Sequence, residues 1–200
     1  DARADRSPGE FYQLDVEMSF VKQEDIFEVF EKLFLKVFTK FSNKKILQNK
    51  FPKITYSESM LKYGTDKPDL RNPLIISDIT EIFQRDDVKF EIFKKLVKSG
   101  SLVRCLITKN TKDKPRSFFD NIDKWAKEQG ASGLAYFTIE KDKEVTGKGP
   151  VGKFFSKDSL EEIMRLTGAE IGDSIFLACA KQKELERITP LARDKIAKDL

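Results

Sequence analysis

Histidine is absent from this sequence of 200 residues. Mechanisms that need an imidazole base, proton shuttle or metal ligand within the chain are therefore excluded, and with them serine-histidine and cysteine-histidine hydrolases. Cysteine is scarce, since only Cys105 and Cys179 occur, each inside a short apolar run. That setting predicts buried, reduced thiols rather than a disulfide framework or a metal pair, and we expect no metal site.

Long apolar runs and a dominant charge are also missing. No segment approaches the roughly 18 apolar residues of a membrane-spanning helix, and no signal peptide is evident, so we expect a cytoplasmic chain with no membrane partner. Lys and Arg number 37 against 33 Asp and Glu, a net charge of +4. That balance gives no electrostatic case for a dedicated nucleic-acid binder. Seventeen Phe and 40% hydrophobic residues do predict a packed, globular protein.

Residues 11–21 alternate between apolar and polar side chains, which predicts a β-strand. Gln13, Asp15 and Glu17 share its polar face with Ser19. Two interpretations stay open: an ordinary exposed strand face, or a substrate platform whose carboxylates and amide hold an amine or a cation.

Residues 24–41 change to helical spacing, with a broad stripe rich in phenylalanine that we interpret as a packing surface without a functional role. A short helix is expected to begin at Ser57 and to stop at Gly64. Pro68 and Pro73 then predict a semi-rigid extended connector, and we place a domain boundary near residue 73.

Beyond that boundary, short apolar runs alternate with helical patterns. We expect a strand or short helix at 74–84, strands at 102–108, 134–140 and 174–180, and helices at 86–98, 117–129, 156–167 and 184–198. This order predicts an α+β or α/β module with helices covering a small mixed sheet. The segment GKGPVGK at 147–153 has the wrong spacing for a phosphate-binding loop, so we interpret it as a turn.

Three sequence strings resemble a known family. RADRSPGEFYQLDVEMSF at 3–20 resembles the latter half of motif 2 of the bacterial-type aspartyl-tRNA synthetases of class II, and YGTDKPDLRNP at 63–73 resembles their entry into an inserted domain. SGLAYFTI at 132–139 is similar, more loosely, to text of the GAD insert. The sequence departs from the family pattern at Ser7, where the family usually has Gln, and at an apparent insertion, Gly9. We therefore carry no nucleotide contact onto Ser7.

The resemblance implies an α+β fold. Residues 1–73 would be part of the antiparallel-sheet catalytic domain of a class II synthetase, and residues 74–200 a GAD-like insert. It also implies a ligase that activates L-aspartate with ATP and Mg²⁺ to aspartyl-adenylate and transfers the aspartyl group to tRNA. Such chemistry relies on positioning and charge neutralisation, which suits a chain without histidine.

Residue roles follow from the same resemblance. Gln13 and Asp15 lie at the amino-acid pocket, with Glu17 as a supporting residue. Asp15 either fixes the α-ammonium group directly or orients a basic residue that holds the substrate carboxylate. Arg3 and Arg6, in the motif 2 loop, lie near ATP or the tRNA acceptor end.

Other parts of the synthetase are expected outside this sequence. The chain starts with Asp1 rather than Met, the motif 2 arginine would lie just before it, and motif 3 would lie beyond Leu200. We therefore expect an inactive fragment with no bound cofactor, drawn from a homodimeric enzyme, with a monomer open for the fragment itself. The alternative is a stand-alone GAD-type module that binds tRNA or protein without catalysis. The insert's task is open between helping to place the tRNA acceptor arm and being a structural appendage.

Overall fold

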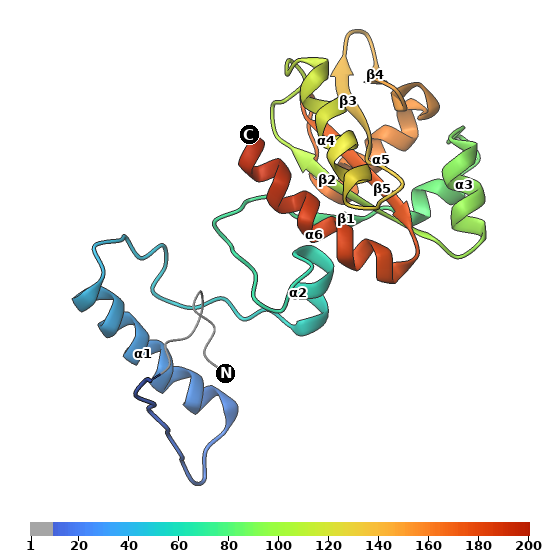
Figure 1. Ribbon diagram of the computed structural model, residues 1–200. Coiled ribbons are helices and arrows are strands. Elements are labelled where there is room, and N and C mark those ends of the chain that lie inside the picture. The colour runs from blue at the N-terminus through green and yellow to red at the C-terminus, as the bar shows by residue number, and fades with distance from the viewer. Residues whose placement is uncertain (1–9) are drawn as a thin grey trace. The chain divides into compact units, whose positions relative to one another are not determined.

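The computed structural model describes residues 10–200, and the chain forms two compact units, Asp1–Lys53 and Ile54–Leu200 (Figure 1). The predicted domain boundary near residue 73 stays a prediction. In the structure, the connector that precedes it belongs to the second unit.

The first unit contains one helix, α1 (Gln23–Phe41), in its described part. The backbone amide of Lys22 donates to the Asp25 carboxylate at 2.8 Å, which satisfies an amide that the helix itself leaves free. The strand predicted for residues 11–21 is not formed. A strand requires a hydrogen-bonded neighbour, and no described segment pairs with these residues, so alternation alone produces only an irregular, largely exposed stretch.

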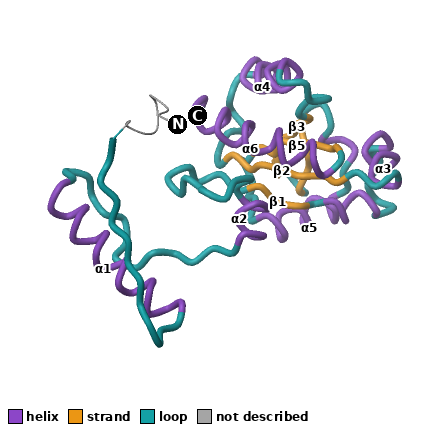
Figure 2. The backbone as a smooth tube through the Cα atoms, turned by 60° about the horizontal axis from the view of Figure 1, so that its bottom comes forward, coloured by secondary structure: helices purple, strands orange, loops and turns teal. Residues whose placement is uncertain are grey.

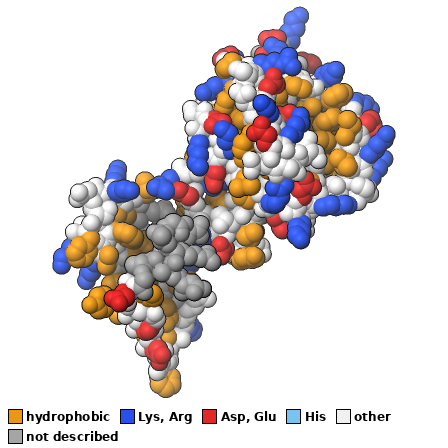
Figure 3. Space-filling model, viewed as in Figure 1, with side chains coloured by type: hydrophobic (Ala, Val, Ile, Leu, Met, Phe, Trp, Pro, Cys, Tyr) orange, Lys and Arg blue, Asp and Glu red, His pale blue; other side chains and the backbone are white. Residues whose placement is uncertain are grey.

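The apolar stripe of α1 lies open within the described residues. None of the helix residues is buried, and Phe38 and Phe41 are 51% and 75% exposed. Phe34 makes the main aromatic contacts, with ring centroids 6.2 Å from Phe38 and 6.4 Å from Phe51. Hydrophobic side chains are accordingly visible on the surface of this unit (Figure 3).

The second unit is built on a five-stranded sheet in the order β1-β2-β5-β3-β4. Its strands are β1 (Ile76–Asp78), β2 (Leu102–Thr108), β3 (Ala135–Lys141), β4 (Val145–Lys148) and β5 (Ser174–Ala180). The α+β class is confirmed, but the expected mixed sheet is wrong, because all four pairings are antiparallel. The crossover through α4 (Arg116–Glu128) joins β2 to β3 and the crossover through α5 (Lys157–Thr167) joins β4 to β5, and each joins strands that run in the same direction. One strand of opposite direction lies between the members of each pair in the sheet, so every direct pairing is antiparallel. Local sequence patterns carry no information on this strand order.

Helices cover both faces of this sheet (Figure 2). The helices α4 and α6 (Gln182–Asp199) pack on one face, over a core that includes Leu106, Tyr136 and Phe176. On the other face α3 (Glu91–Lys98), α5 and the 3₁₀ helix η1 (Thr80–Gln84) enclose a core that includes Cys105 and Phe137. Neighbouring strand residues therefore face different cores, which explains the continuous apolar runs of β2 and β5.

The segment 147–153 is only partly the expected turn. Val145–Lys148 pairs with β3 as strand β4, and a short 3₁₀ helix η2 (Gly152–Phe154) follows. Gly147 and Gly152 pack backbone to backbone, since a β-carbon on Gly147 would lie 2.8 Å from the carbonyl oxygen of Gly152. The glycines therefore permit a close chain crossing and do not form a phosphate loop.

Two other predictions are confirmed in this unit. The helix expected from Ser57 is α2 (Tyr56–Lys62), which Thr55 caps by accepting from the Glu58 amide at 3.2 Å. Cys105 and Cys179 are free thiols, 1% and 9% exposed. Within residues 10–200, every helix is too short or too polar to span a bilayer.

Candidate functional site

Gln13 and Asp15 are brought together by the extended stretch that precedes α1. The Nε2 atom of Gln13 donates to Oδ1 of Asp15 at 2.7 Å. Both side chains are exposed, as is Glu17, for which no contact with this pair is found among the described residues. The pair therefore presents an amide and a carboxylate side by side, although no sheet supports them here.

The chemistry of this pair suits a positively charged or hydrogen-bond-donating group. An ionised carboxylate accepts hydrogen bonds from an ammonium group strongly, and the Gln13 amide that bonds Asp15 helps to orient it. Arg3, Arg6, Ser7 and Gly9, the predicted loop residues, lie outside the described residues. In the described part of the chain, no group of three or more metal-ligating side chains is found.

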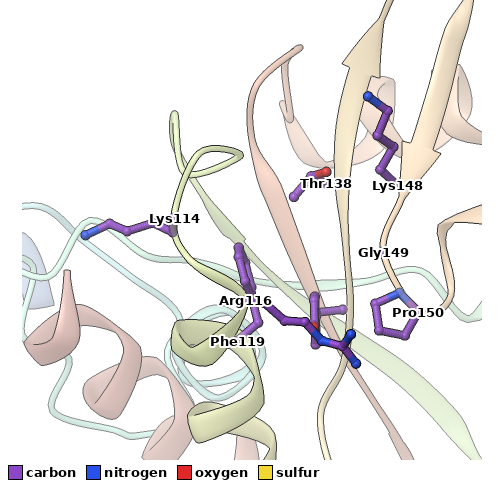
Figure 4. Close-up of a pocket in the computed structure, with 8 residues that line it drawn as sticks. Lys114, Arg116, Phe119, Thr138, Lys148, Gly149 and Pro150 are labelled. Carbon is purple, nitrogen blue, oxygen red and sulfur yellow. The ribbon is translucent and has the colours of Figure 1, made fainter.

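A cavity of about 460 Å³ lies in the second unit between α4, β3 and the turn after β4 (Figure 4). Its floor includes the rings of Phe119 and Tyr136, which are stacked with centroids 4.7 Å apart. Burial, followed by the hydrogen bond that its hydroxyl donates to Asp120 at 2.9 Å, raises the pKa of Tyr136. This floor is buried and has little freedom to rearrange.

The rim of the cavity carries Lys114, Arg116 and Lys148, but their charges are largely occupied. Arg116 pairs with Asp120 at 3.2 Å and Lys148 with Glu140 at 2.5 Å. Lys114 lies over the Phe118 ring, with its Nζ atom 5.4 Å from the centroid, and Figure 4 shows it directed away from the other labelled side chains. The cavity is therefore mostly apolar and has a weakly cationic rim. Lys148, from the GKGPVGK segment, is part of that rim.

A second cavity of about 390 Å³ separates α2 from α6 and exposes part of Arg104. The Nη1 atom of Arg104 lies 3.1 Å from Oδ2 of Asp78, its cross-strand neighbour, yet it is buried without hydrogen-bond geometry. The ion pair accounts for the charge, and Glu186 on the same wall adds a second carboxylate. Neither cavity gathers the functional groups that the sequence pointed to.

Sequence reasoning missed Arg193, a buried charged side chain of the second unit. It is 2% exposed and lies on α6, in a stretch whose high charge is typical of a solvated helix face. Its position next to the apolar positions Ile188, Ala192 and Ile196 is the one signal of burial that the sequence contains.

Comparisons with known proteins cover both units. A family model described as tRNA synthetases class II (D, K and N) matches residues 1–185. The chain is 78% identical over 200 residues to the "Aspartate--tRNA(Asp/Asn) ligase" of Pelagibacter ubique (strain HTCC1062), covering 100% of this chain and 34% of that protein. It is 52% identical to the protein of the same name from Wolbachia pipientis wMel and 48% identical to that of Methylorubrum populi, each over 100% of this chain and 33% of the relative. The chain thus spans about a third of the length of the curated relatives it matches.

Proposed function

The chain belongs to the class II tRNA synthetases of the D, K and N group, and from this premise we propose that it is part of an aspartate–tRNA ligase. The full-length protein would activate L-aspartate with ATP and transfer the aspartyl group to tRNA. The observation that carries the proposal is a 78% identity to a ligase of this kind that runs through the whole chain.

The adjacent Gln13 and Asp15 supply the local chemistry of this proposal. Asp15 would hold the ammonium group of aspartate, or orient a basic residue that holds the substrate carboxylate, and Gln13 would add amide hydrogen bonds. Glu17 would support them from further along the stretch. Arg3 and Arg6 would lie near ATP and the acceptor end of tRNA.

Mg²⁺ would neutralise the phosphate charge of ATP during adenylate formation. The described residues offer no cluster of three metal ligands, so we assign no residue of this chain to the ion. We retain as proposals a homodimeric full-length enzyme, a cytoplasmic location, and the assignment of residues 1–73 to the catalytic domain and 74–200 to the insert.

A role for the second unit in contacting tRNA is the second candidate. Lys114 on the cavity rim favours it, because a basic side chain on an exposed edge can meet backbone phosphates without reading sequence. The alternative of a stand-alone binding module is not favoured, since the family match begins in the first unit and continues into α6.

Aspartate-dependent ATP–pyrophosphate exchange by the full-length protein tests the main proposal. Wild type should exchange, and Asp15→Asn should lower kcat/KM for aspartate by about 100-fold or more, because the ammonium group loses its ionic partner. Asp142→Asn, which removes an exposed carboxylate in the second unit, is the matched control and should leave exchange unchanged. A folded wild-type protein without exchange for any amino acid would contradict the proposal.

Titration of the full-length protein with tRNA at several salt concentrations tests the second candidate. If Lys114 contacts a phosphate, Lys114→Gln should reduce the slope of log affinity against log salt by roughly 0.7 to 0.9. Lys183→Gln, an exposed charge change at the start of α6, should leave the slope as it is. Equal slopes for wild type and both variants would count against a tRNA contact at this rim.

A further inference from the structure

Arg193 is a buried cation that serves the backbone of another segment. Its guanidinium group is almost fully enclosed, and the nearest carboxylate oxygen recorded among the described residues, on Asp194, is 3.8 Å from Nη1. A buried charge without a close ion pair is costly unless its donors are satisfied in another way. The acceptors of the Arg193 hydrogen bonds therefore indicate the structural role of this residue.

Those hydrogen bonds all lead to residues 63–74, which we call the connector. The Nε atom donates to the carbonyl of Leu74 at 2.6 Å, and Nη2 donates to the carbonyls of Asp69 and Asn72 at 2.9 and 2.7 Å. The guanidinium carbon also lies 5.1 Å from the centroid of the Tyr63 ring. One side chain thus contacts the connector near both of its ends.

The connector also makes side-chain contacts with α6. The side-chain amide of Asn72 donates to the Arg193 carbonyl at 3.3 Å and to Asp194 at 3.4 Å, while its oxygen accepts from the Leu74 amide at 3.0 Å. Gly64 packs directly against Pro190 of the same helix. The carbonyl groups of the connector have no partners in a β-sheet. The Arg193 side chain supplies the hydrogen bonds that a neighbouring strand would otherwise provide.

Arginine is the residue that this arrangement requires. Its planar group directs several N–H donors along fixed directions, which a lysine ammonium on a flexible stem does not reproduce for three separate carbonyls. The three acceptors lie at residues 69, 72 and 74, within one turn of irregular chain. Their spacing matches one fork-shaped donor.

We propose that Arg193 is a positioning residue that latches the connector to the second unit, so that residues 56–74 move with that unit as one body. Any change of orientation between the units is then absorbed between the first unit and α2, at residues 53–55, and not in the proline-containing connector. The proposal rests on the proposed function in one respect: the second unit, so held, would present its surface to tRNA during the transfer step while leaving aspartate activation to the first unit's residues.

The test uses the full-length protein and three variants. Arg193→Met keeps the length and apolar stem of the side chain but removes its donors, Arg193→Lys keeps only the charge, and Arg187→Met is the matched control. Arg187 is exposed on the same helix and donates to a single carbonyl, that of Gln129, at 2.8 Å. Hydrogen exchange is measured at the Arg71 and Leu74 amides and, for comparison, along β2 and β5.

In Arg193→Met, exchange at Arg71 and Leu74 should accelerate by about tenfold or more, while β2 and β5 change by less than about threefold. Pyrophosphate exchange should stay within about twofold of wild type, whereas kcat/KM for tRNA charging falls by at least about fivefold. Arg193→Lys should fall between wild type and Arg193→Met, and Arg187→Met should match wild type in each measurement.

Three results would overturn the proposal. The first is unchanged exchange at Arg71 and Leu74 in Arg193→Met. The second is unchanged tRNA charging although the connector has been released. The third is faster exchange along β2 and β5 together with an equal loss of both reactions, which would show a general structural role. A wild type without aspartate-dependent exchange refutes the proposed function instead, and the hydrogen-exchange comparison still decides whether the latch exists.

Discussion

Gly64 lies so close to Pro190 that a β-carbon on the glycine would come within 2.1 Å of the Cγ atom of the proline ring. Gly64 also has a φ of +70°, a conformation that costs other residues about 1 kcal/mol or more. We expect Gly64→Ala to lower the free energy of unfolding of the second unit by about 3 kcal/mol, from backbone strain together with overpacking. Urea denaturation followed by circular dichroism would measure the change.

Gly168 provides the matched control for this prediction. It has nearly the same φ, +69°, at the end of α5, but a β-carbon there would meet no atom within 4 Å. Gly168→Ala should therefore cost only the backbone strain, about 1 kcal/mol. Equal losses for the two variants would show that the Pro190 contact contributes nothing.

A buried hydroxyl network joins the loop after β2 to the start of β5. The hydroxyls of Thr108 and Thr111 lie 2.6 Å apart, and that of Thr111 is 2.7 Å from the Ser174 hydroxyl. Thr111→Val keeps the shape but leaves buried partners unsatisfied, so we expect a loss of about 1 to 3 kcal/mol in the free energy of unfolding. Thr146→Val, at an exposed position of β4, should change it by less than about 0.5 kcal/mol.

The Asp69 carboxyl group should remain ionised at pH values at which an ordinary aspartate is already protonated. The hydrogen bonds from the Arg71 side chain, then the Arg71 amide, lower the pKa of Asp69 from 3.8 to about 2. Because the folded-state pKa is the lower one, the stabilisation is present above about pH 4 and is lost as pH falls from there toward about pH 2. Carboxyl ¹³C shifts followed by NMR would give the pKa, and Arg71→Gln should return it toward 3.8.

The two thiols should be unreactive in the folded chain. Burial raises the pKa of Cys105 to about 12 and that of Cys179 to about 11. At pH 8 both are almost entirely protonated, and the protonated thiol is a poor nucleophile. We expect no rapid reaction with Ellman's reagent in the native state and reaction of both thiols in guanidinium chloride, with Cys179 the first to react if the native chain reacts at all. Immediate labelling of Cys105 in the native chain would contradict its burial.

The sequence predicted the parts of the fold that depend on local pattern. The strands β2 and β5 were predicted with their observed bounds, because each is a short apolar run between clear helix and turn signals. The polar face at Gln13 and Asp15 was identified as a group, and the structure brings these two side chains into contact. Their roles in a reaction stay predictions.

Features of the fold that depend on long-range contacts were not predicted from the sequence. The antiparallel direction of every pairing follows from the strand order, which local pattern does not encode. The strand β4 was missed because Gly147 and the glycines that follow it at 149 and 152 resemble a turn. Arg193 was missed because its three acceptors are carbonyls at residues 69, 72 and 74, more than 100 positions away. Every residue has a backbone carbonyl, so the residue types at these positions do not predict a hydrogen bond from a distant arginine.

The strand order has a consequence for how the second unit is made. β5 lies between β2 and β3, so the pair β1-β2 and the pair β3-β4 do not touch within the sheet except through it. During synthesis the ribosome produces both pairs before the strand that joins them. Two sheet edges therefore stay unpaired until the last strand is made, and non-local pairings of this kind favour slow folding.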